Sequence, residues 1–253
     1  MGGRIETYLL SKIKKDGAIH LSLLDPEKVS SAEASQISKE AEKAGTTAIM
    51  VGGSTVTNVK TVDVIVKALK TAVKIPVILF PNDVTGVSRY ADALWFMSLL
   101  NSSNPYFITG AQAAASTLIK AYGLEPIPLG YIITGEGGAA CLIGQAQSIP
   151  YNRPDAAVAY ALAAQYLGMH FVYLEAGSGA RVHVPLEMIT AVKRAIGIPL
   201  IVGGGIRTGR DAGKVVESGA DVVVTGTVVE ETGSVKDKIS ELVQSIKRAA
   251  ERR

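Results

Sequence analysis

Short apolar runs alternate with amphipathic segments along this chain, and the alternation predicts eight strands, each followed by a helix. The runs are rich in valine, isoleucine and leucine, which is typical of parallel strands buried on both faces. We expect strands at residues 18–26, 47–54, 75–81, 106–110, 127–135, 171–180, 199–202 and 221–225.

The amphipathic segments predict helices before the first strand and between the strands. We expect them at residues 4–15, 31–43, 59–73, 91–100, 112–121, 155–167, 186–195, 208–218 and 234–253, with Ser31 and Asp155 capping two of them. The pattern is least regular over residues 84–104, so an irregularity is expected around the third helix. Residues 135–154 form a loop that is too long for a bare connector.

This order of elements favours an α/β fold, a (β/α)8 TIM-type barrel. The 253 residues are close to the usual length of one such barrel, and no linker interrupts them, so we expect residues 1–253 to be one domain. A doubly wound open sheet shows the same alternation and is the main alternative. Against it, no GxGxxG motif follows the first strand, and the glycine-rich turns cluster near the end of the chain.

The stretch Ile198–Thr227 carries the clearest local signal. Its two strands end in glycine-rich turns, Gly203-Gly204-Gly205 and Gly226, each followed by polar residues. Turns without side chains leave backbone N–H groups open to a phosphate dianion. In (β/α)8 barrels the common phosphate site lies on the loops after strands seven and eight, where these turns are expected.

Composition narrows the class of partner. The formal charge of +3 is too small to indicate nucleic-acid binding, and much of the excess lies in residues 247–253, typical of a solvated helix end. The single cysteine, Cys141, excludes an internal disulfide and suits a reducing compartment. No apolar run is long enough for a transmembrane helix, and residues near the start lack a signal-peptide core, so we expect a cytoplasmic protein.

Candidate chemistry lies at the C-terminal ends of the predicted strands, where barrels carry their active sites. The polar residues at these ends are Asp25, Ser54, Asn82, Asp83, Thr109, Glu136, Tyr173, Glu175, Ser178, Arg207 and Thr227. Asp25 follows an apolar strand and precedes a proline, so it could bind Mg²⁺, act as a base or close a turn. Tyr173 and Glu175 alternate along one strand and therefore point to the same side, which we expect to be the pocket. There the glutamate could accept a proton from a substrate hydroxyl.

Other chemistries lack their residues. No lysine at a strand end could form a Schiff base, and His20, His170 and His183 are scattered, with no Cys/His metal cluster. What is left is a phosphate cradle, a tyrosine–glutamate pair and one or two oxygen ligands. Mg²⁺ suits this set, because it takes few carboxylates together with substrate phosphates.

Five motifs, in this order and spacing, resemble the geranylgeranylglyceryl phosphate synthase family. They are LLDP with Asp25, VGGST with Ser54, YLEAGSGA, VGGGIRT and TGT, and the resemblance spans almost the whole chain. It implies a (β/α)8 barrel that joins the C3 hydroxyl of sn-glycerol 1-phosphate to geranylgeranyl diphosphate, with Mg²⁺. This reaction is the first committed step of archaeal ether-lipid synthesis. The resemblance also implies a homo-oligomer, a dimer or a hexamer, with a transient membrane-surface contact for the lipid product.

The resemblance assigns site residues by motif. Asp25 and Ser54 would hold Mg²⁺, while Glu175 and Tyr173 would be catalytic. The acceptor would be bound by Tyr173, Leu174, Glu175, Ala176, Gly177, Ser178 and Gly179, and its phosphate by Gly204, Gly205, Gly226 and Thr227. Some family members carry a lysine two residues before the metal aspartate, where this chain has Leu23. The substitution indicates the other main branch of the family and leaves open what replaces the lysine.

A prenyl chain needs a long apolar groove. The candidates to line it are Tyr90, Leu94, Trp95, Met97 and Leu118, although an apolar helix of this length more often packs on the barrel or forms a subunit contact. Two other functions share the phosphate cradle: a phosphosugar barrel enzyme of the indole, histidine or thiamine type, and a phosphate-ligand sensor without chemistry.

Overall fold

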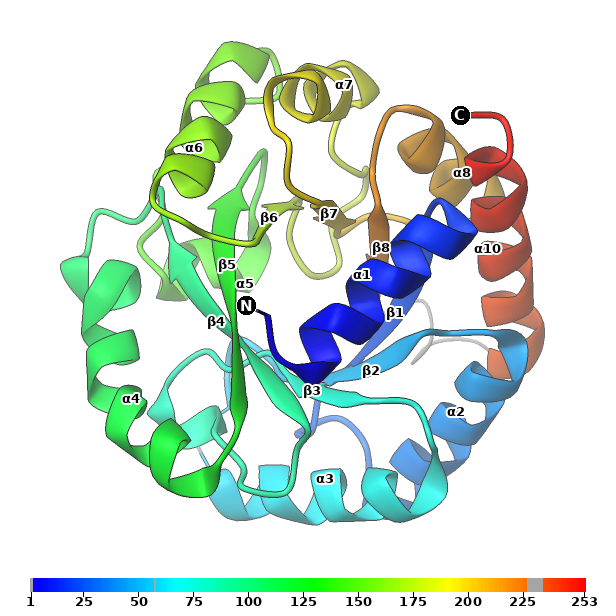
Figure 1. Cartoon of the computed structure of the whole chain (residues 1–253). Helices are drawn as coiled ribbons and strands as arrows, with labels where there is room; N and C mark the ends of the chain where they lie inside the picture. The colour runs from blue at the N-terminus through cyan, green and yellow to red at the C-terminus, as the bar shows by residue number, and fades with distance from the viewer. Residues whose placement is uncertain (1, 57, 227–233) are drawn as a thin grey trace.

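Eight parallel strands close into a barrel in the order β1 to β8, with β1 paired to β8 (Figure 1). The computed structural model describes residues 2–56, 58–226 and 234–253. The strands are β1 Ile19–Leu24, β2 Ala48–Val51, β3 Val77–Leu79, β4 Ala93–Leu99, β5 Glu125–Ile133, β6 Phe171–Glu175, β7 Leu200–Gly203 and β8 Val222–Thr225. The predicted (β/α)8 barrel is confirmed, and the open-sheet alternative is wrong. That residues 1–253 form one domain stays a prediction.

Helices form a ring around the strands (Figure 1). They are α2 Ser31–Ala44, α3 Val59–Ala72, α4 Ala111–Tyr122, α6 Pro154–Tyr166, α7 Leu186–Ala195, α8 Gly209–Glu217 and α10 Val235–Ala250. A further helix, α1 Arg4–Asp16, lies across one end of the barrel and buries Ile5 and Leu9 in the cluster of side chains inside it. The Glu125 carboxylate accepts hydrogen bonds from the first N–H groups of α1, those of Ile5 and Glu6, at 2.8 Å each. This carboxylate caps the positive end of the helix.

The fourth strand is not where the sequence predicts it. Residues 91–100 were expected to be a helix, but they contain β4, which pairs with β5 from Ala93↔Glu125 to Leu99↔Tyr131. The expected strand at 106–110 is a π-helix, η2 Tyr106–Gly110, so Thr109 does not follow a strand. The error has a physical cause, because β4 is apolar on both faces. Trp95 packs inside the barrel and Leu94 against the outer layer, a pattern that a buried helix shares.

The expected irregularity lies between β3 and β4. There the chain forms only a short 3-10 helix, η1 Val84–Gly86, in place of a full helix of the outer ring. The long loop 135–154 contains a short helix, α5 Gly138–Ile143. Both features lie at the C-terminal end of the barrel and line the cavity described below.

Two predicted caps are wrong by one or two residues. The N-cap of α2 is Ser30, which forms a capping box with Glu33, rather than Ser31. Helix α6 begins at Pro154 after Arg153, and its first turn contains Asp155, which pairs with Arg153 at 2.7 Å instead of capping the helix. Proline at the first position explains the shift, because its missing N–H needs no partner there.

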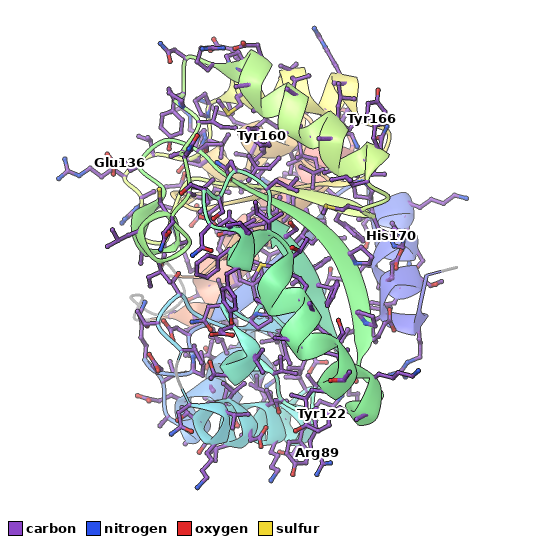
Figure 2. All side chains as sticks on the ribbon, turned by 90° about the vertical axis from the view of Figure 1, so that its left-hand side faces the viewer. Arg89, Tyr122, Glu136, Tyr160, Tyr166 and His170 are labelled. Carbon is purple, nitrogen blue, oxygen red and sulfur yellow. The ribbon has the colours of Figure 1, made fainter. Side chains whose placement is uncertain are left out.

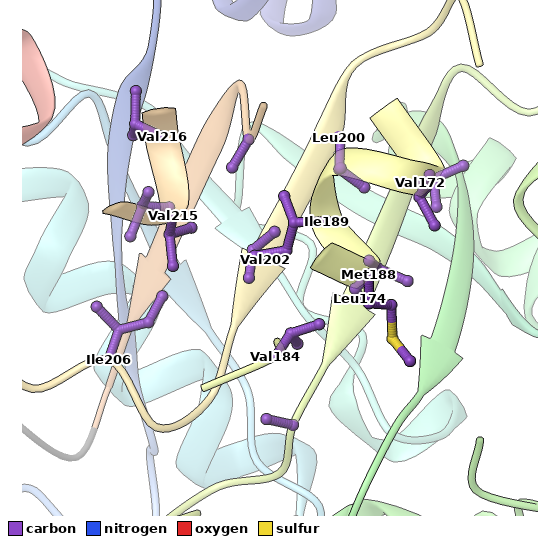
Figure 3. Close-up of a cluster of buried hydrophobic side chains, with 14 of the residues drawn as sticks. Val172, Leu174, Val184, Met188, Ile189, Leu200, Val202, Ile206, Val215 and Val216 are labelled. Atoms are coloured by element: carbon purple, nitrogen blue, oxygen red, sulfur yellow. The ribbon is translucent and has the colours of Figure 1, made fainter. Parts of the chain in front are cut away.

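The pleat of β6 decides which side chains reach the barrel interior. Val172 and Leu174 pack in the layer between the strands and the surrounding helices, with Leu174 beside Met188 of α7 (Figure 3). Phe171 and Tyr173 therefore point inward, and Glu175 follows on the same side. None of the described helices is long and apolar enough to cross a membrane.

Candidate active site

A cavity of about 310 Å³ opens at the C-terminal ends of the barrel strands. It has a polar part inside the barrel mouth and an apolar arm that runs over β4. Its polar part is lined by residues that follow several strands, among them Asp25, Ser54, Asn82, Glu175, Ser178, Gly179, Gly204, Gly205, Arg207 and Gly226. The barrel closure brings these residues together although they lie far apart in the sequence.

The apolar arm is lined by side chains from both faces of β4, among them the inward Trp95 and the outward Leu94. Its walls come from β4, the segment around η1, η2, and α4, and they include Val87, Leu94, Trp95, Phe96, Met97, Phe107, Ala111, Ala115 and Ile119. Three of the five groove candidates, Leu94, Trp95 and Met97, lie in this lining, whereas Tyr90 and Leu118 do not. Instead, the Lys67 ammonium nitrogen lies over the Tyr90 ring, 4.1 Å from the ring centre.

Glu175 is buried in the cavity wall, with 6% of its surface exposed. Its Oε1 accepts a hydrogen bond from the Gly177 N–H at 2.6 Å, and the Tyr173 and Tyr131 hydroxyls also hydrogen-bond to the carboxylate. Burial raises the pKa of Glu175, and these three hydrogen bonds oppose the rise. A buried carboxylate with a raised pKa can accept a proton from a hydroxyl.

The two tyrosines next to Glu175 remain phenols. Burial raises the pKa of Tyr131 and of Tyr173 well above the usual value, and the negative charge of Glu175 adds to the rise. Both rings pack against Phe80, Tyr131 edge-on with centroids 5.4 Å apart and Tyr173 stacked at 5.6 Å. The hydroxyls therefore act as fixed hydrogen-bond donors at the base of the cavity.

The glycine turn after β7 makes room for this group. A Cβ atom on Gly203 would lie 2.0 Å from the Tyr173 hydroxyl oxygen, and one on Gly204 would lie 2.5 Å from Glu175 Oε1. Gly204 and Gly205 also have φ values of +82° and +68°, which disfavour other residues. The turn is thus needed to make room for the Tyr173 hydroxyl and the Glu175 carboxylate.

The other predicted acceptor residues divide into two groups. Ser178, Gly179, Gly204, Gly205 and Gly226 line the cavity, whereas Leu174, Ala176 and Gly177 are not in its lining. Leu174 is fully buried against the helices. Thr227 lies outside the described residues. Glu136, another predicted strand-end residue, is exposed at the edge of the molecule (Figure 2) and does not line the cavity.

The predicted metal residues lie together at the ends of β1 and β2. A Cβ atom on Gly53 would meet the Asp25 carboxylate at 2.7 Å, so the two strand ends pack closely. Asp25 Oδ1 accepts a hydrogen bond from the Glu27 N–H at 3.0 Å, and Ser54 lines the same cavity. Asn82 is also in the lining, and its buried Oδ1 has no hydrogen-bond partner in the described structure.

This oxygen set fits Mg²⁺, which takes few protein carboxylates and completes its shell with water and phosphate oxygens. No group of three or more His, Cys, Asp or Glu side chains gathers anywhere in the described ranges. Lys28 lies beside this oxygen set, with Nζ 3.6 Å from Asp25 Oδ2.

Sequence patterns alone missed Tyr131, Phe80 and Lys28. Tyr131 could have been found, since β5 pairs with β6 and places Tyr131 next to Tyr173. Lys28 lies beyond the strand end, and only the turn at Asp25 brings its side chain into the cavity lining.

The model of the PcrB family matches residues 11–246 of the chain. The chain belongs to the PcrB family. It is 48% identical over 250 residues to the geranylgeranylglyceryl phosphate synthase of Thermofilum pendens, covering 99% of this chain and 98% of that protein. It is 51% identical over 248 residues to the enzyme of the same name from Thermococcus sibiricus, covering 97% of each.

A solved structure extends the similarity to three dimensions. The (S)-3-O-geranylgeranylglyceryl phosphate synthase of Thermoplasma acidophilum, in complex with its substrate sn-glycerol-1-phosphate, superposes with a TM-score of 0.94. The two chains are 40% identical, and the match covers 98% of this chain and 100% of that one. The family resemblance inferred from the motifs is therefore confirmed.

Proposed function

We propose that this PcrB-family protein is a geranylgeranylglyceryl phosphate synthase. It would join the C3 hydroxyl of sn-glycerol 1-phosphate to geranylgeranyl diphosphate and release diphosphate, the first committed step of archaeal ether-lipid synthesis. The observation that carries the proposal is one cavity with two kinds of wall. A glycine cradle and a buried carboxylate lie at one part, and an apolar arm leads away over β4.

The acceptor fits the side of the cavity formed by β6, β7 and β8. The turns at Gly204, Gly205 and Gly226 offer backbone N–H groups to its phosphate, and the exposed Arg207 lines the cavity next to them. Glu175 and Tyr173 then face the glycerol hydroxyls. Both are held in place by the contacts described above. A fixed acceptor orients the attacking hydroxyl better than a mobile one.

The donor diphosphate fits the opposite side, at the ends of β1, β2 and β3. Asp25, Ser54 and Asn82 would hold Mg²⁺, which supplies positive charge to the leaving diphosphate. Leu23 lines this region where some relatives have a lysine, and Lys28 brings an ammonium group there from the next turn. We propose that Lys28 takes over part of the missing lysine's charge.

The chemical step needs little beyond positioning and charge. The bond between C1 of the prenyl chain and the diphosphate oxygen breaks, and the diphosphate keeps the electron pair. The C3 oxygen forms the new bond to C1, and its proton passes to the Glu175 carboxylate. The apolar arm binds the prenyl tail and excludes water from C1, which prevents hydrolysis of the donor.

A direct assay tests the proposal. The protein is incubated with radiolabelled sn-glycerol 1-phosphate and farnesyl, geranylgeranyl or heptaprenyl diphosphate, with Mg²⁺ or with EDTA. We expect an ether product with the geranylgeranyl donor that requires Mg²⁺, is lost in Asp25→Asn, and loses most of its kcat in a folded Glu175→Ala variant. Tight glycerol phosphate binding without product from any donor would favour a sensor. Turnover of a phosphosugar instead would favour the other barrel enzymes.

We also propose a homo-oligomer, a dimer or a hexamer, in the cytoplasm. Helix α6 buries Ala157, Ala161 and Ala164 against the barrel, while Tyr166 and Leu167 at its end are 78% and 71% exposed (Figure 2). Neighbouring apolar side chains with such exposure favour a protein contact. Light scattering of the native protein and of Tyr166→Glu tests this, and a monomer in both would contradict it.

For the lipid product, we also propose a transient membrane contact near the exposed Leu142 of α5.

A further inference from the structure

Tyr131 is a buried polar side chain of the cavity that neither the motifs nor the comparisons assign. It is 6% exposed and lies on β5, where Tyr131 pairs with Tyr173 and Ile133 with Glu175. In a parallel pair this register places Tyr131 one inward position deeper in the barrel than Glu175. From this deeper position its hydroxyl hydrogen-bonds to the Glu175 carboxylate.

The packing around Tyr131 fixes the position of its ring. The ring centroid lies 5.4 Å from that of Phe80 and 5.2 Å from that of Tyr173, both in edge-on contacts at 88° and 75°. Such contacts hold an aromatic ring in one orientation. Because the ring is fixed, the direction in which the hydroxyl can donate is fixed as well.

A buried carboxylate needs such donors. Removing Glu175 from water penalises its charged form, which is the form that accepts a proton. Three donors offset this cost: the Gly177 N–H at 2.6 Å and the hydroxyls of Tyr131 and Tyr173. Of the two tyrosines, Tyr173 belongs to the predicted acceptor-binding motif, whereas Tyr131 lies outside every predicted motif.

We infer that Tyr131 is a positioning residue, which fixes the Glu175 carboxylate from the barrel interior in the orientation that receives the acceptor's proton. The inference rests on the proposed function, since it supplies the condition under which Glu175 can act as the base.

Tyr131→Phe removes one hydroxyl and keeps the ring contacts. We expect kcat at neutral pH to fall by about tenfold, the worth of one hydrogen bond to a charged group. The KM for sn-glycerol 1-phosphate should change little, because Tyr131 does not hold the phosphate. With one donor fewer, Glu175 is protonated at higher pH, so the acid limb of the kcat/KM profile moves up by about one pH unit. Much of the lost activity therefore returns at alkaline pH.

Two variants serve as controls. Tyr160→Phe makes the same change on α6, outside the cavity (Figure 2), and should leave kcat and the pH profile as in the native protein. Glu175→Gln keeps the size of the side chain but has no charge, so it should lose activity equally at every pH. An equal loss at every pH in Tyr131→Phe would indicate a merely structural role and overturn the inference, as would an unchanged profile.

A measurement without turnover separates this inference from the proposed function. The infrared carboxylate band that is present in the native protein and absent in Glu175→Gln reports the ionisation of Glu175 directly. Its titration midpoint should be higher in Tyr131→Phe than in the native protein, and equal midpoints would overturn the inference. If the midpoint rises but the native protein makes no ether, the hold of Tyr131 on Glu175 stands and the proposed reaction fails.

Discussion

Gly204 and Glu175 occupy one packed unit, since a Cβ atom on the glycine would lie 2.5 Å from the carboxylate oxygen Oε1 and 2.8 Å from the Gly177 backbone. The turn after β7 and the end of β6 therefore cannot change independently. Glycine at this position leaves the space that the carboxylate needs.

Gly204→Ala is expected to displace Glu175 and strain the backbone, which has a φ of +82° here. We predict a loss of about 1–3 kcal/mol in the free energy of unfolding, together with weaker binding of sn-glycerol 1-phosphate. Urea unfolding and calorimetric titration measure the two effects. The matched control is Gly213→Ala on α8, where a Cβ would have ordinary contacts at 3.7 Å, and it should be neutral or stabilising. Equal effects in both variants would contradict the packing argument.

Lys28→Met is expected to weaken the donor side of the cavity alone. Removing the ammonium group beside Asp25 takes positive charge from the proposed diphosphate site. We predict a rise in the KM for geranylgeranyl diphosphate of roughly tenfold at low salt, which shrinks as salt screens the interaction. The KM for sn-glycerol 1-phosphate should stay constant.

Two variants serve as controls. Arg207→Gln should raise the KM for sn-glycerol 1-phosphate and leave that for geranylgeranyl diphosphate constant, and Lys60→Met, at the exposed start of α3, should change neither constant. A similar rise in both constants for Lys28→Met would show that the two phosphate sites are not separate.

Trp95→Ala is expected to lengthen the apolar arm. The indole is almost fully buried, packs edge-on against Phe171 at 5.2 Å, and its Nε1 has no hydrogen-bond partner in the described structure. Truncation leaves a cavity and costs about 3–5 kcal/mol of stability. The added space should raise the activity with longer donors relative to geranylgeranyl diphosphate, which competition between heptaprenyl and geranylgeranyl donors measures. Trp95→Phe retains most of the volume and should shift the ratio less. An unchanged ratio in Trp95→Ala would place the end of the prenyl chain elsewhere.

The sequence predicts the barrel because its strands and turns are specified locally. Helix α7 was predicted at its observed bounds, and the inward side of β6 followed from the alternation of Tyr173 and Glu175. The fourth strand was not predictable in this way, because residues 93–99 are buried on both faces and their pattern does not distinguish a strand from a helix.

The candidate site shows the same division. Asp25, Ser54, Glu175 and the glycine turns stand at strand ends and could be found one by one. Tyr131 joins the site through the pairing of β5 with β6, whereas Phe80 joins it only through the closure of the barrel, which sets the end of β3 against the same interior as β6. Contacts across a barrel depend on strand register and barrel closure, and no single segment of the sequence specifies either.

His20 makes the stability of the barrel depend on pH. Its ring nitrogens lie 2.8 Å from the hydroxyls of Thr46 and Thr225, and burial lowers the pKa of His20 from 6.5 to about 3. In the unfolded chain His20 is protonated below about pH 6.5. In the folded chain it stays neutral until the pH falls to about 3. The free energy of unfolding should therefore fall as the pH falls between these values, by up to about 5 kcal/mol, and show no contribution from His20 above pH 7.

Urea unfolding of the native protein and of His20→Gln, between pH 4 and pH 8, measures the difference. The variant should be less stable than the native protein at pH 8, and the gap should narrow at pH 4. A gap of constant size would show that protonation of His20 does not drive the acid sensitivity.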